Sequence, residues 1–154
     1  MIFVTVGTHE QGLERLLVEL DNLIENGSIK EEVFAQIGYS SYKPRNYQYK
    51  KMIGYSEMDS YVQKARIVIT HGGPGSIFHP LQYGKIPIVV PRDPNFNEHV
   101  DNHQILFTTF VTNRYTRVNW NIYTTNRKHN SSISCWRIRH ITIHYIWSQD
   151  ICLY

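Results

Sequence analysis

A β-branched run joined directly to a glycine-rich turn is the feature that most constrains how this chain can fold. Residues 67–70 (Ile-Val-Ile-Thr) have the character of a buried strand, and residues 71–76 (His-Gly-Gly-Pro-Gly-Ser) supply the turn. Apolar residues then recur at helical spacing until Gly84, and residues 86–90 form a second apolar run, closed by Pro91. This order predicts two parallel strands joined by a right-handed helical crossover.

The turn between the predicted strand and helix has the composition of an anion-binding site. Glycines let a ligand approach the backbone closely, and the free N–H groups at a helix start attract negative charge. Ser76 either donates a hydroxyl hydrogen bond or caps the helix. His71 stands at the carboxyl end of the strand, where open α/β sheets bind their ligands. A tight turn with no ligand is the alternative that these residues leave open.

Strand and helix signals alternate along the first 111 residues. Apolar or alternating runs at 1–6, 32–37 and 47–52 predict three further strands. Leucines at helical spacing predict a helix over residues 13–24, and Ser56 is the expected N-cap of a helix over residues 57–64. Residues 98–110 are also expected to be helical. The predicted fold class is α/β, with a Rossmann-like parallel sheet.

The composition changes sharply near residue 111. Residues 1–111 hold ten Lys or Arg against twelve Asp or Glu, whereas residues 112–154 hold six against one and contain no glycine, proline or alanine. We therefore expect one α/β domain over residues 1–111 and an atypical basic, aromatic tail over residues 112–154. Our interpretation of the tail is a frameshift, with a lineage-specific extension as the alternative. Cys135 and Cys152 lie in this tail and are expected to be free thiols.

Further motifs follow the glycine-rich turn in a fixed order. Residues 84–92 read Gly-Lys-Ile-Pro-Ile-Val-Val-Pro-Arg, residues 98–104 read Glu-His-Val-Asp-Asn-His-Gln, and residues 3–11 read Phe-Val-Thr-Val-Gly-Thr-His-Glu-Gln. Together with residues 70–76 they resemble the C-terminal, nucleotide-sugar-binding domain of family 28 glycosyltransferases. The chain looks most similar to short, single-domain galactosyltransferase subunits of bacterial capsule and exopolysaccharide synthesis. Those in turn are similar to the catalytic subunit of the eukaryotic two-subunit GlcNAc transferase that makes dolichol-linked sugars.

The resemblance implies which residues bind a UDP-sugar. The expected binding residues are Gly7, Thr8, His71, Gly72, Gly73, Pro74, Gly75, Ser76, His79, Arg92, Glu98, His99, Asn102, His103 and Gln104. Arg92 is expected to neutralise the pyrophosphate, with a plain surface charge as the alternative. His79 stands where many relatives carry a glutamate suited to both ribose hydroxyls, so ribose recognition is expected to differ or donor affinity to be lower. A solvated helix face is the alternative interpretation of residues 98–104.

The resemblance implies an activity as well. By this resemblance the chain is the donor-binding half of an inverting GT-B glycosyltransferase. The expected reaction transfers a hexose from a UDP-sugar to a lipid-linked acceptor, in the synthesis of a capsule or exopolysaccharide repeat unit. Galactose is favoured over GlcNAc as the sugar. His9 and Glu98 are the candidate catalytic bases on this chain. No metal-ligand cluster is apparent in the sequence, and the resemblance implies chemistry without a metal or other cofactor.

A partner is expected because a GT-B active site needs two lobes and this chain supplies one. The expected partner is a membrane-anchored, acceptor-binding subunit, which would hold this chain at the inner face of the membrane. The chain itself is expected to be cytoplasmic, since no run approaches the ~20 apolar residues of a membrane span and no secretion signal is apparent. Two alternatives stay open. One is a truncated or frameshifted remnant that binds UDP-sugar without turnover, and the other is nucleic-acid binding through the tail, although no known module is present.

Overall fold

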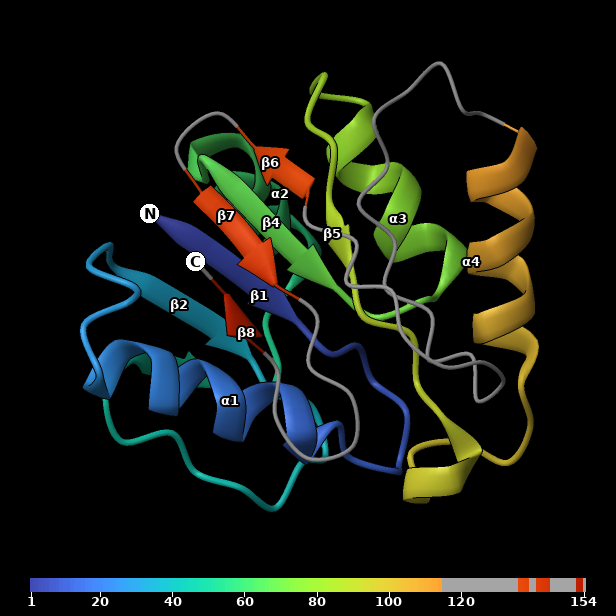
Figure 1. The fold of residues 1–154 in the computed structure, drawn as a ribbon, viewed down its shortest axis with the longest axis horizontal. Helices are drawn as coiled ribbons and strands as arrows, with labels where there is room; N and C mark the ends of the chain where they lie inside the picture. Colours follow the sequence, from blue (N-terminus) through green and yellow to red (C-terminus); the bar gives the residue numbers. More distant parts are fainter. Residues whose placement is uncertain (115–135, 139–140, 145–151, 154) are drawn as a thin grey trace.

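The computed structural model describes residues 1–114, 136–138, 141–144 and 152–153, with side chains described as far as residue 111. Five strands form one sheet that is parallel throughout (Figure 1). These strands are β1 (Ile2–Thr5), β2 (Val33–Gln36), β3 (Gln48–Lys50), β4 (Ile67–Thr70) and β5 (Ile88–Val89). The helices are α1 (Glu14–Glu25), α2 (Tyr55–Lys64), α3 (Pro74–Leu81) and α4 (His103–Arg114), with a 3-10 turn, η1, at Pro94–Phe96. The predicted α/β sheet is confirmed.

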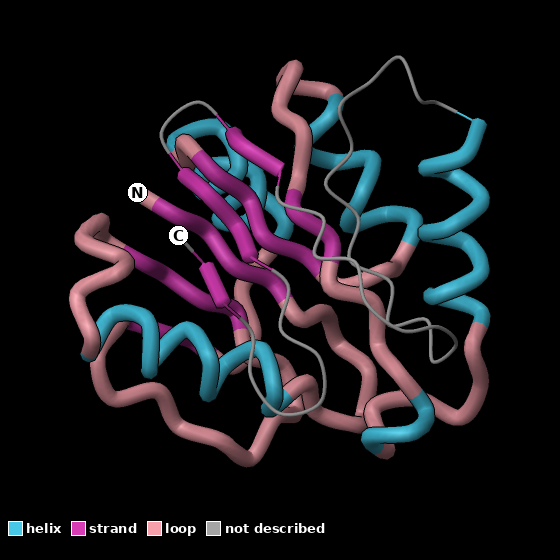
Figure 2. The backbone as a smooth tube through the Cα atoms, viewed as in Figure 1, coloured by secondary structure: helices cyan, strands magenta, loops and turns pink. Residues whose placement is uncertain are grey.

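The strand order β3-β2-β1-β4-β5 makes β1 the centre of the sheet (Figure 2). From β1 the chain moves outward through β2 to β3, and it then crosses back to lay β4 on the other side of β1. The direction of winding therefore reverses between β1 and β4. In open α/β sheets such a reversal opens a crevice at the carboxyl ends of the two strands.

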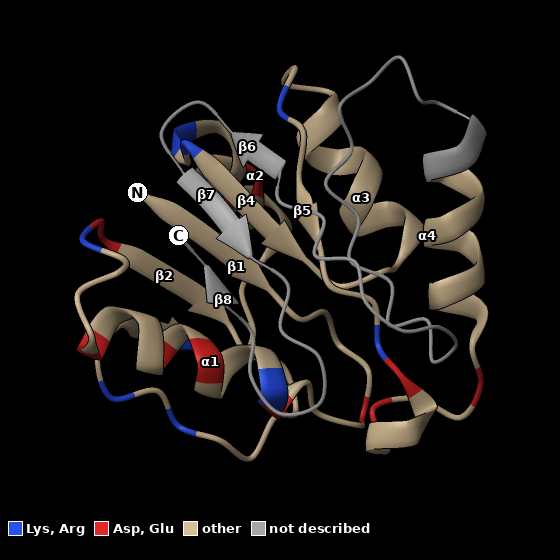
Figure 3. Cartoon of the chain, in the orientation of Figure 1, with Lys and Arg blue, Asp and Glu red and all other residues tan. Residues whose placement is uncertain are grey.

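Alternate residues of each strand face opposite layers. Ile2, Val4 and Val6 join the core that contains α1, whose leucines Leu16, Leu17 and Leu20 are buried there. Phe3, by contrast, packs on the other face with Val62 of α2. Both faces of β1 are thus covered, as expected of a strand made wholly of β-branched and large apolar residues. Charged residues lie around the sheet and not on β1 or β4 (Figure 3).

Two predicted helix starts were wrong. Ser56 lies inside α2, which begins at Tyr55 with Gly54 as its N-cap. The helix expected over 98–110 begins only at His103 and continues to Arg114. Asn97 at the end of η1 has a left-handed backbone (φ 58°), and the Asp101 carboxylate accepts a hydrogen bond from the His103 N–H at 3.0 Å. Residues 98–102 are consequently a loop that leads into α4.

The strands β6 (Trp136–Ile138), β7 (Ile141–His144) and β8 (Cys152–Leu153) pair antiparallel in a separate sheet. Most of the tail predicted at 112–154 lies outside the described residues, so its interpretation as a frameshift stays a prediction. Within the described part of the chain, no helix combines the length and the apolar character needed to cross a membrane.

Candidate functional site

The carboxyl ends of β1 and β4 meet at the winding reversal, and His71 fills the space between their loops. A Cβ atom added to Gly7 would lie 2.5 Å from Cε1 of the His71 ring, and one added to Gly73 would lie 2.5 Å from its Nε2. Gly7 also has a positive φ of 76°, which L side chains rarely adopt. The prediction that residue 7 lies beside the glycine-rich turn is confirmed, and both glycines are required by contact with one imidazole.

The His71 imidazole is neutral at physiological pH. Burial lowers its pKa from 6.5 to about 4, and the positive charge of Arg92 lowers it further in the same direction. Its Nδ1 atom is buried and has no hydrogen-bond partner among the described residues. The ring therefore sets the separation of the two loops and carries no charge toward a ligand.

Helix α3 presents an uncapped N-terminus at the same edge of the sheet. Gly73 is the N-cap residue and makes no side-chain cap hydrogen bond, and Pro74 occupies the first turn. Ser76 lies within the helix, so the interpretation of Ser76 as a cap was wrong. A Cβ added to Gly75 would meet no atom within 4 Å. The first-turn backbone is thus open to an anion, which the helix dipole would attract.

A cavity of about 400 Å³ adjoins the start of α3. It lies between α2 and α3, and Thr5 and Val68 of the sheet also line it. The glycine turn contributes Gly75 and Ser76. The remaining lining residues are Tyr55, Met58, Val62, Phe78, His79, Pro80 and Gln82. This mixture of apolar and aromatic walls with a few polar groups is typical of small-molecule sites.

His79 is held in this cavity by a carboxylate from the neighbouring helix. Its Nε2 lies 2.8 Å from Oδ1 of Asp59, and its ring stacks on Tyr55 at 5.7 Å between centroids. The Tyr83 hydroxyl donates to the same Asp59 oxygen at 2.5 Å. These bonds, first that of Tyr83 and then that of His79, lower the pKa of Asp59. A carboxylate therefore lies next to His79, although it comes from α2 and not from α3.

Arg92 is not a surface charge, so that alternative was wrong. Its side chain is fully buried. Nη1 donates to the carbonyl oxygens of Gln11, of Gly12 at 3.0 Å and of Glu98 at 3.1 Å, and Nη2 donates to that of Val6 at 2.7 Å. The guanidinium thus ties together the loop after β1 and the loop before α4. Because its hydrogen bonds are directed to these carbonyls, the guanidinium supports the two loops, and its contact with pyrophosphate stays a prediction.

Glu98 is engaged in a buried ion pair. Its carboxylate accepts from Nε of Arg15 at 3.1 Å and from Nη2 at 2.9 Å, and it also accepts from the Asp93 backbone N–H at 3.0 Å. The side chain of Glu98 is only 5% exposed. A carboxylate held in this way stabilises the loop, and it is poorly placed to collect a proton from a ligand.

The loop before α4 is divided between buried and exposed side chains. Glu98, His99 and Gln104 are buried, so the interpretation of residues 98–104 as a solvated face was wrong for these three. The side-chain carbonyl of Gln104 accepts from the Arg92 backbone N–H at 3.2 Å. Asn102 and His103 are exposed. Of the polar residues expected to meet a sugar, Asn102 and His103 are therefore open to a ligand in this structure.

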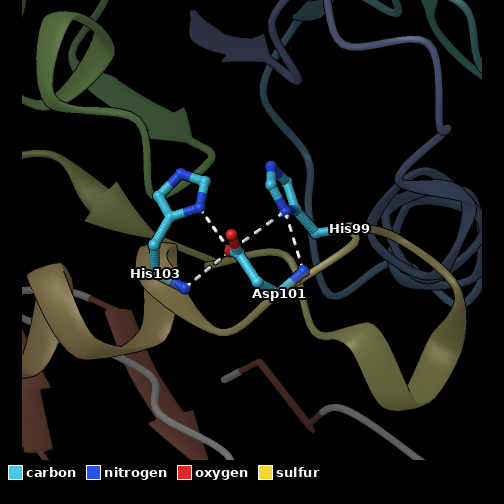
Figure 4. Close-up of side chains that lie close together, drawn as sticks. All are labelled: His99, Asp101 and His103. Atoms are coloured by element: carbon cyan, nitrogen blue, oxygen red, sulfur yellow. Dashed lines mark hydrogen bonds and ion pairs between the residues drawn. The ribbon is translucent and has the colours of Figure 1, made fainter.

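Three imidazoles, those of His9, His99 and His103, converge beside that loop, and Figure 4 shows the last two. The His99 ring lies 4.4 Å from the ring of His9 and 4.4 Å from that of His103. Burial and the neighbouring histidines lower the pKa of His99. Its Nδ1 accepts the Asp101 N–H at 3.3 Å, so we regard the nearby Asp101 carboxylate as a polar neighbour of a neutral ring and not as its ion-pair partner. His9 accepts from the Gln11 N–H through Nδ1.

Several residues that shape this edge carry no signal in the sequence that marks them. Gln36 holds the turn after β1: its side-chain carbonyl accepts from the N–H of Gly7 at 3.2 Å, and its amide donates to the Gly7 carbonyl at 3.0 Å. Arg15, Tyr55, Asp59 and Asp101 were also not singled out. Their partners are distant in sequence or arise from a loop whose path is not periodic, so no local pattern marks them. A metal-ligand group was likewise not foreseen, yet His99, Asp101 and His103 place their ligand atoms within 4.8 Å of one another.

Comparison with known proteins places these observations in a family. A search of curated proteins found no match. The model of the glycosyltransferase family 28 C-terminal domain matches residues 1–121, which include the whole five-stranded sheet and helices α1 to α4. The chain therefore belongs to the glycosyltransferase family 28 C-terminal domain family.

Proposed function

We propose that this chain is the donor-binding subunit of an inverting glycosyltransferase that uses a UDP-hexose, with galactose favoured. The acceptor would be a lipid-linked saccharide in the synthesis of a capsule or exopolysaccharide repeat unit. Family membership supports glycosyl transfer as the class of reaction. The donor sugar, the acceptor and the pathway rest on the similarity of the sequence motifs to short galactosyltransferase subunits.

The observation that carries the proposal is the open start of α3 beside the cavity. An uncapped helix N-terminus offers N–H donors to a diphosphate, and the open space over Gly75 lets the phosphates approach the backbone. The adjoining cavity of about 400 Å³ has the size of a small-molecule site. The ring of Tyr55 and the pair His79–Asp59 offer a stacking surface and hydrogen-bonding groups for a nucleoside.

The proposed reaction is a single displacement at the anomeric carbon. An acceptor hydroxyl attacks that carbon from the face opposite the diphosphate, and the new C–O bond forms as the bond to the UDP oxygen breaks. UDP leaves with the bonding electron pair, and the α3 N-terminus stabilises the added negative charge. The hydroxyl proton passes to a general base, and the product has the inverted configuration.

His9 is the better candidate for the base on this chain. It lies in the loop after β1, where its Nδ1 accepts the Gln11 backbone N–H and Nε2 carries the proton of the neutral ring. To act as the base, Nδ1 would exchange this backbone hydrogen bond for the proton of the acceptor hydroxyl. Glu98 is bound by Arg15 and by the Asp93 N–H instead. A base on the partner subunit is the competing possibility, since the acceptor would be held there.

Transfer can be tested in membranes that contain the acceptor-binding partner. Radiolabelled UDP-galactose is supplied with a glucosyl-lipid acceptor, and the full chain is compared with a version that carries a family-typical C-terminus. Transfer of label to lipid by the full chain is the expected result. Failure of both proteins with every UDP-sugar would overturn the proposal.

A second function is favoured by the change in composition near residue 111. If residues 112–154 replace a segment needed for turnover, the chain would bind UDP-sugar without transferring it. The same assay separates the two functions. Transfer by the version with a family-typical C-terminus alone, with UDP binding by both, identifies the full chain as a non-catalytic remnant.

A further inference from the structure

The loop that leads into α4 gathers two imidazoles and a carboxylate around a small space. Oδ1 of Asp101 lies 3.4 Å from Nδ1 of His99 and 2.5 Å from Nδ1 of His103 (Figure 4). All three ligand atoms lie within 4.8 Å of one another. Both rings thus place Nδ1 near one carboxylate oxygen. Nδ1 of His99 also accepts the Asp101 N–H at 3.3 Å, a bond that coordination of an ion would replace.

We propose that His99, Asp101 and His103 bind a divalent transition-metal ion, with Zn²⁺ as the best match. Two imidazole nitrogens and one carboxylate oxygen form a donor set that suits zinc and its neighbours better than Mg²⁺, which prefers oxygen ligands. Three protein ligands leave at least one coordination position for water or for an oxygen of a bound molecule. The inference concerns metal binding and does not depend on the proposed transferase activity.

The two separations that involve Asp101 can be compared with those that a tetrahedral ion requires. Bonds of ~2.05 Å at tetrahedral angles place neighbouring ligand atoms about 3.4 Å apart. The separation of Asp101 and His99 already has this value, at 3.4 Å. His103 would have to move back from Asp101 by about 1 Å. That movement is easy because the side chains of Asp101 and His103 are 59% and 53% exposed.

The surroundings favour this ion over a simple hydrogen-bonded pair. His99 is buried, and its Nδ1 accepts the Asp101 N–H, so this nitrogen has the lone pair with which imidazole binds metals. The nearby charges of Arg15 and Glu98 neutralise each other in an ion pair, so no unpaired positive charge of this pair repels a bound cation. His9 packs against the other side of His99 and helps to fix the orientation of its ring.

The test is titration of the metal-free full chain with Zn²⁺ by calorimetry, with three variants alongside. Asp101→Asn keeps an N-capping oxygen for α4 but removes the charged ligand. His103→Ala removes an exposed imidazole. His79→Ala is the matched control, because His79 also lies beside an aspartate, at 2.8 Å, but with no third ligand among the described residues. Any sites in residues 112–154 contribute equally to all four proteins.

We expect Zn²⁺ affinity at one site to fall at least about tenfold in Asp101→Asn and His103→Ala and to stay unchanged in His79→Ala. Co²⁺ should give visible d–d absorption in the wild type that both cluster variants lose, and Mg²⁺ should not compete. Equal thermal midpoints of the metal-free proteins would confirm that the variants are folded. Identical Zn²⁺ isotherms for all four proteins, with or without binding, would overturn the proposal.

Discussion

Replacing Arg92 with alanine should destabilise the protein more than any exposed charge substitution. The guanidinium is fully buried and donates to four backbone carbonyls, those of Val6, Gln11, Gly12 and Glu98. These carbonyls belong to the loop after β1 and the loop before α4, so one side chain joins the two loops. Alanine would remove all of these bonds and leave a cavity.

The expected loss can be bounded from these contacts. Each hydrogen bond to a charged group contributes about 1.5–3 kcal/mol, but the four bonds share one side chain and are not additive. Burying the guanidinium also costs free energy, which its removal returns. We therefore expect the free energy of unfolding to fall by about 3–5 kcal/mol, the usual loss when one partner of a buried charged network is removed. Arg92→Lys should recover only part of this free energy, because a single ammonium group cannot donate to both loops as the planar guanidinium does.

Urea unfolding followed by circular dichroism measures this loss. Arg66→Ala is the matched control: Arg66 is also paired with a carboxylate, Glu31, but its side chain is 46% exposed. The control should lose no more than about 1 kcal/mol. Losses of similar size for Arg92→Ala and Arg66→Ala would refute the role of Arg92 as a clamp between the loops.

Three further predictions concern the loops that follow β1 and β4 and the residues that support them. Because the pKa of His71 is about 4 in the folded protein and 6.5 in the unfolded chain, its contribution to stability is complete above pH 6.5 and is lost as the pH falls toward 4. Between pH 7 and pH 4.5 the free energy of unfolding of His71→Asn, measured in urea, should therefore fall by about 2–3 kcal/mol less than that of the wild type. Parallel pH curves for the two proteins would contradict this. Gly7→Ala should lower the free energy of unfolding by at least about 2 kcal/mol, because Gly7 has a positive φ and contacts His71. Gly75→Ala should leave it unchanged or raise it slightly, because a Cβ there meets no atom. Equal midpoints of the two variants in thermal melts would count against the packing of Gly7 on His71. Gln36→Leu should lower the free energy of unfolding by about 2–4 kcal/mol, because the Gly7 carbonyl loses its donor and the Thr5 hydroxyl loses its acceptor. A loss under about 0.5 kcal/mol in urea would show that the turn holds without Gln36.

The order of strands and helices could be read from the sequence because local periodicity determines it. The runs at β1 and β4 are continuous and β-branched, as buried parallel strands require, and the leucines of α1 recur on one helical face. The start of α4 could not be read in this way. There the left-handed Asn97 and the capping contact of Asp101 decide where the helix begins. Residues 98–102, which are polar and have a helical composition, form a loop before that start.

The glycine-rich turn was also predictable, because glycine and proline determine the local backbone conformation by themselves. The roles of Arg92 and Glu98 were not, because both depend on partners far away in the chain. Arg92 bonds to Val6, 86 residues away, and Glu98 bonds to Arg15, 83 residues away. Two charged residues beside a strand end resemble a ligand-binding set in sequence. Burial and non-local hydrogen bonds show that this pair supports the site.

The most direct test of the account is calorimetric titration of the full chain with UDP-galactose, using two variants. Gly75→Leu places a side chain in the open space at the start of α3, and Gly75 lines the cavity. Gly54→Leu is the control, because a Cβ at Gly54 also meets no atom within 4 Å and Gly54 does not line that cavity. We predict that the wild type and Gly54→Leu bind UDP-galactose and that Gly75→Leu, with an unchanged fold, binds at least about tenfold more weakly, a loss of about 1.4 kcal/mol. Equal binding by all three proteins, or no binding by the wild type to any UDP-sugar, would contradict the account.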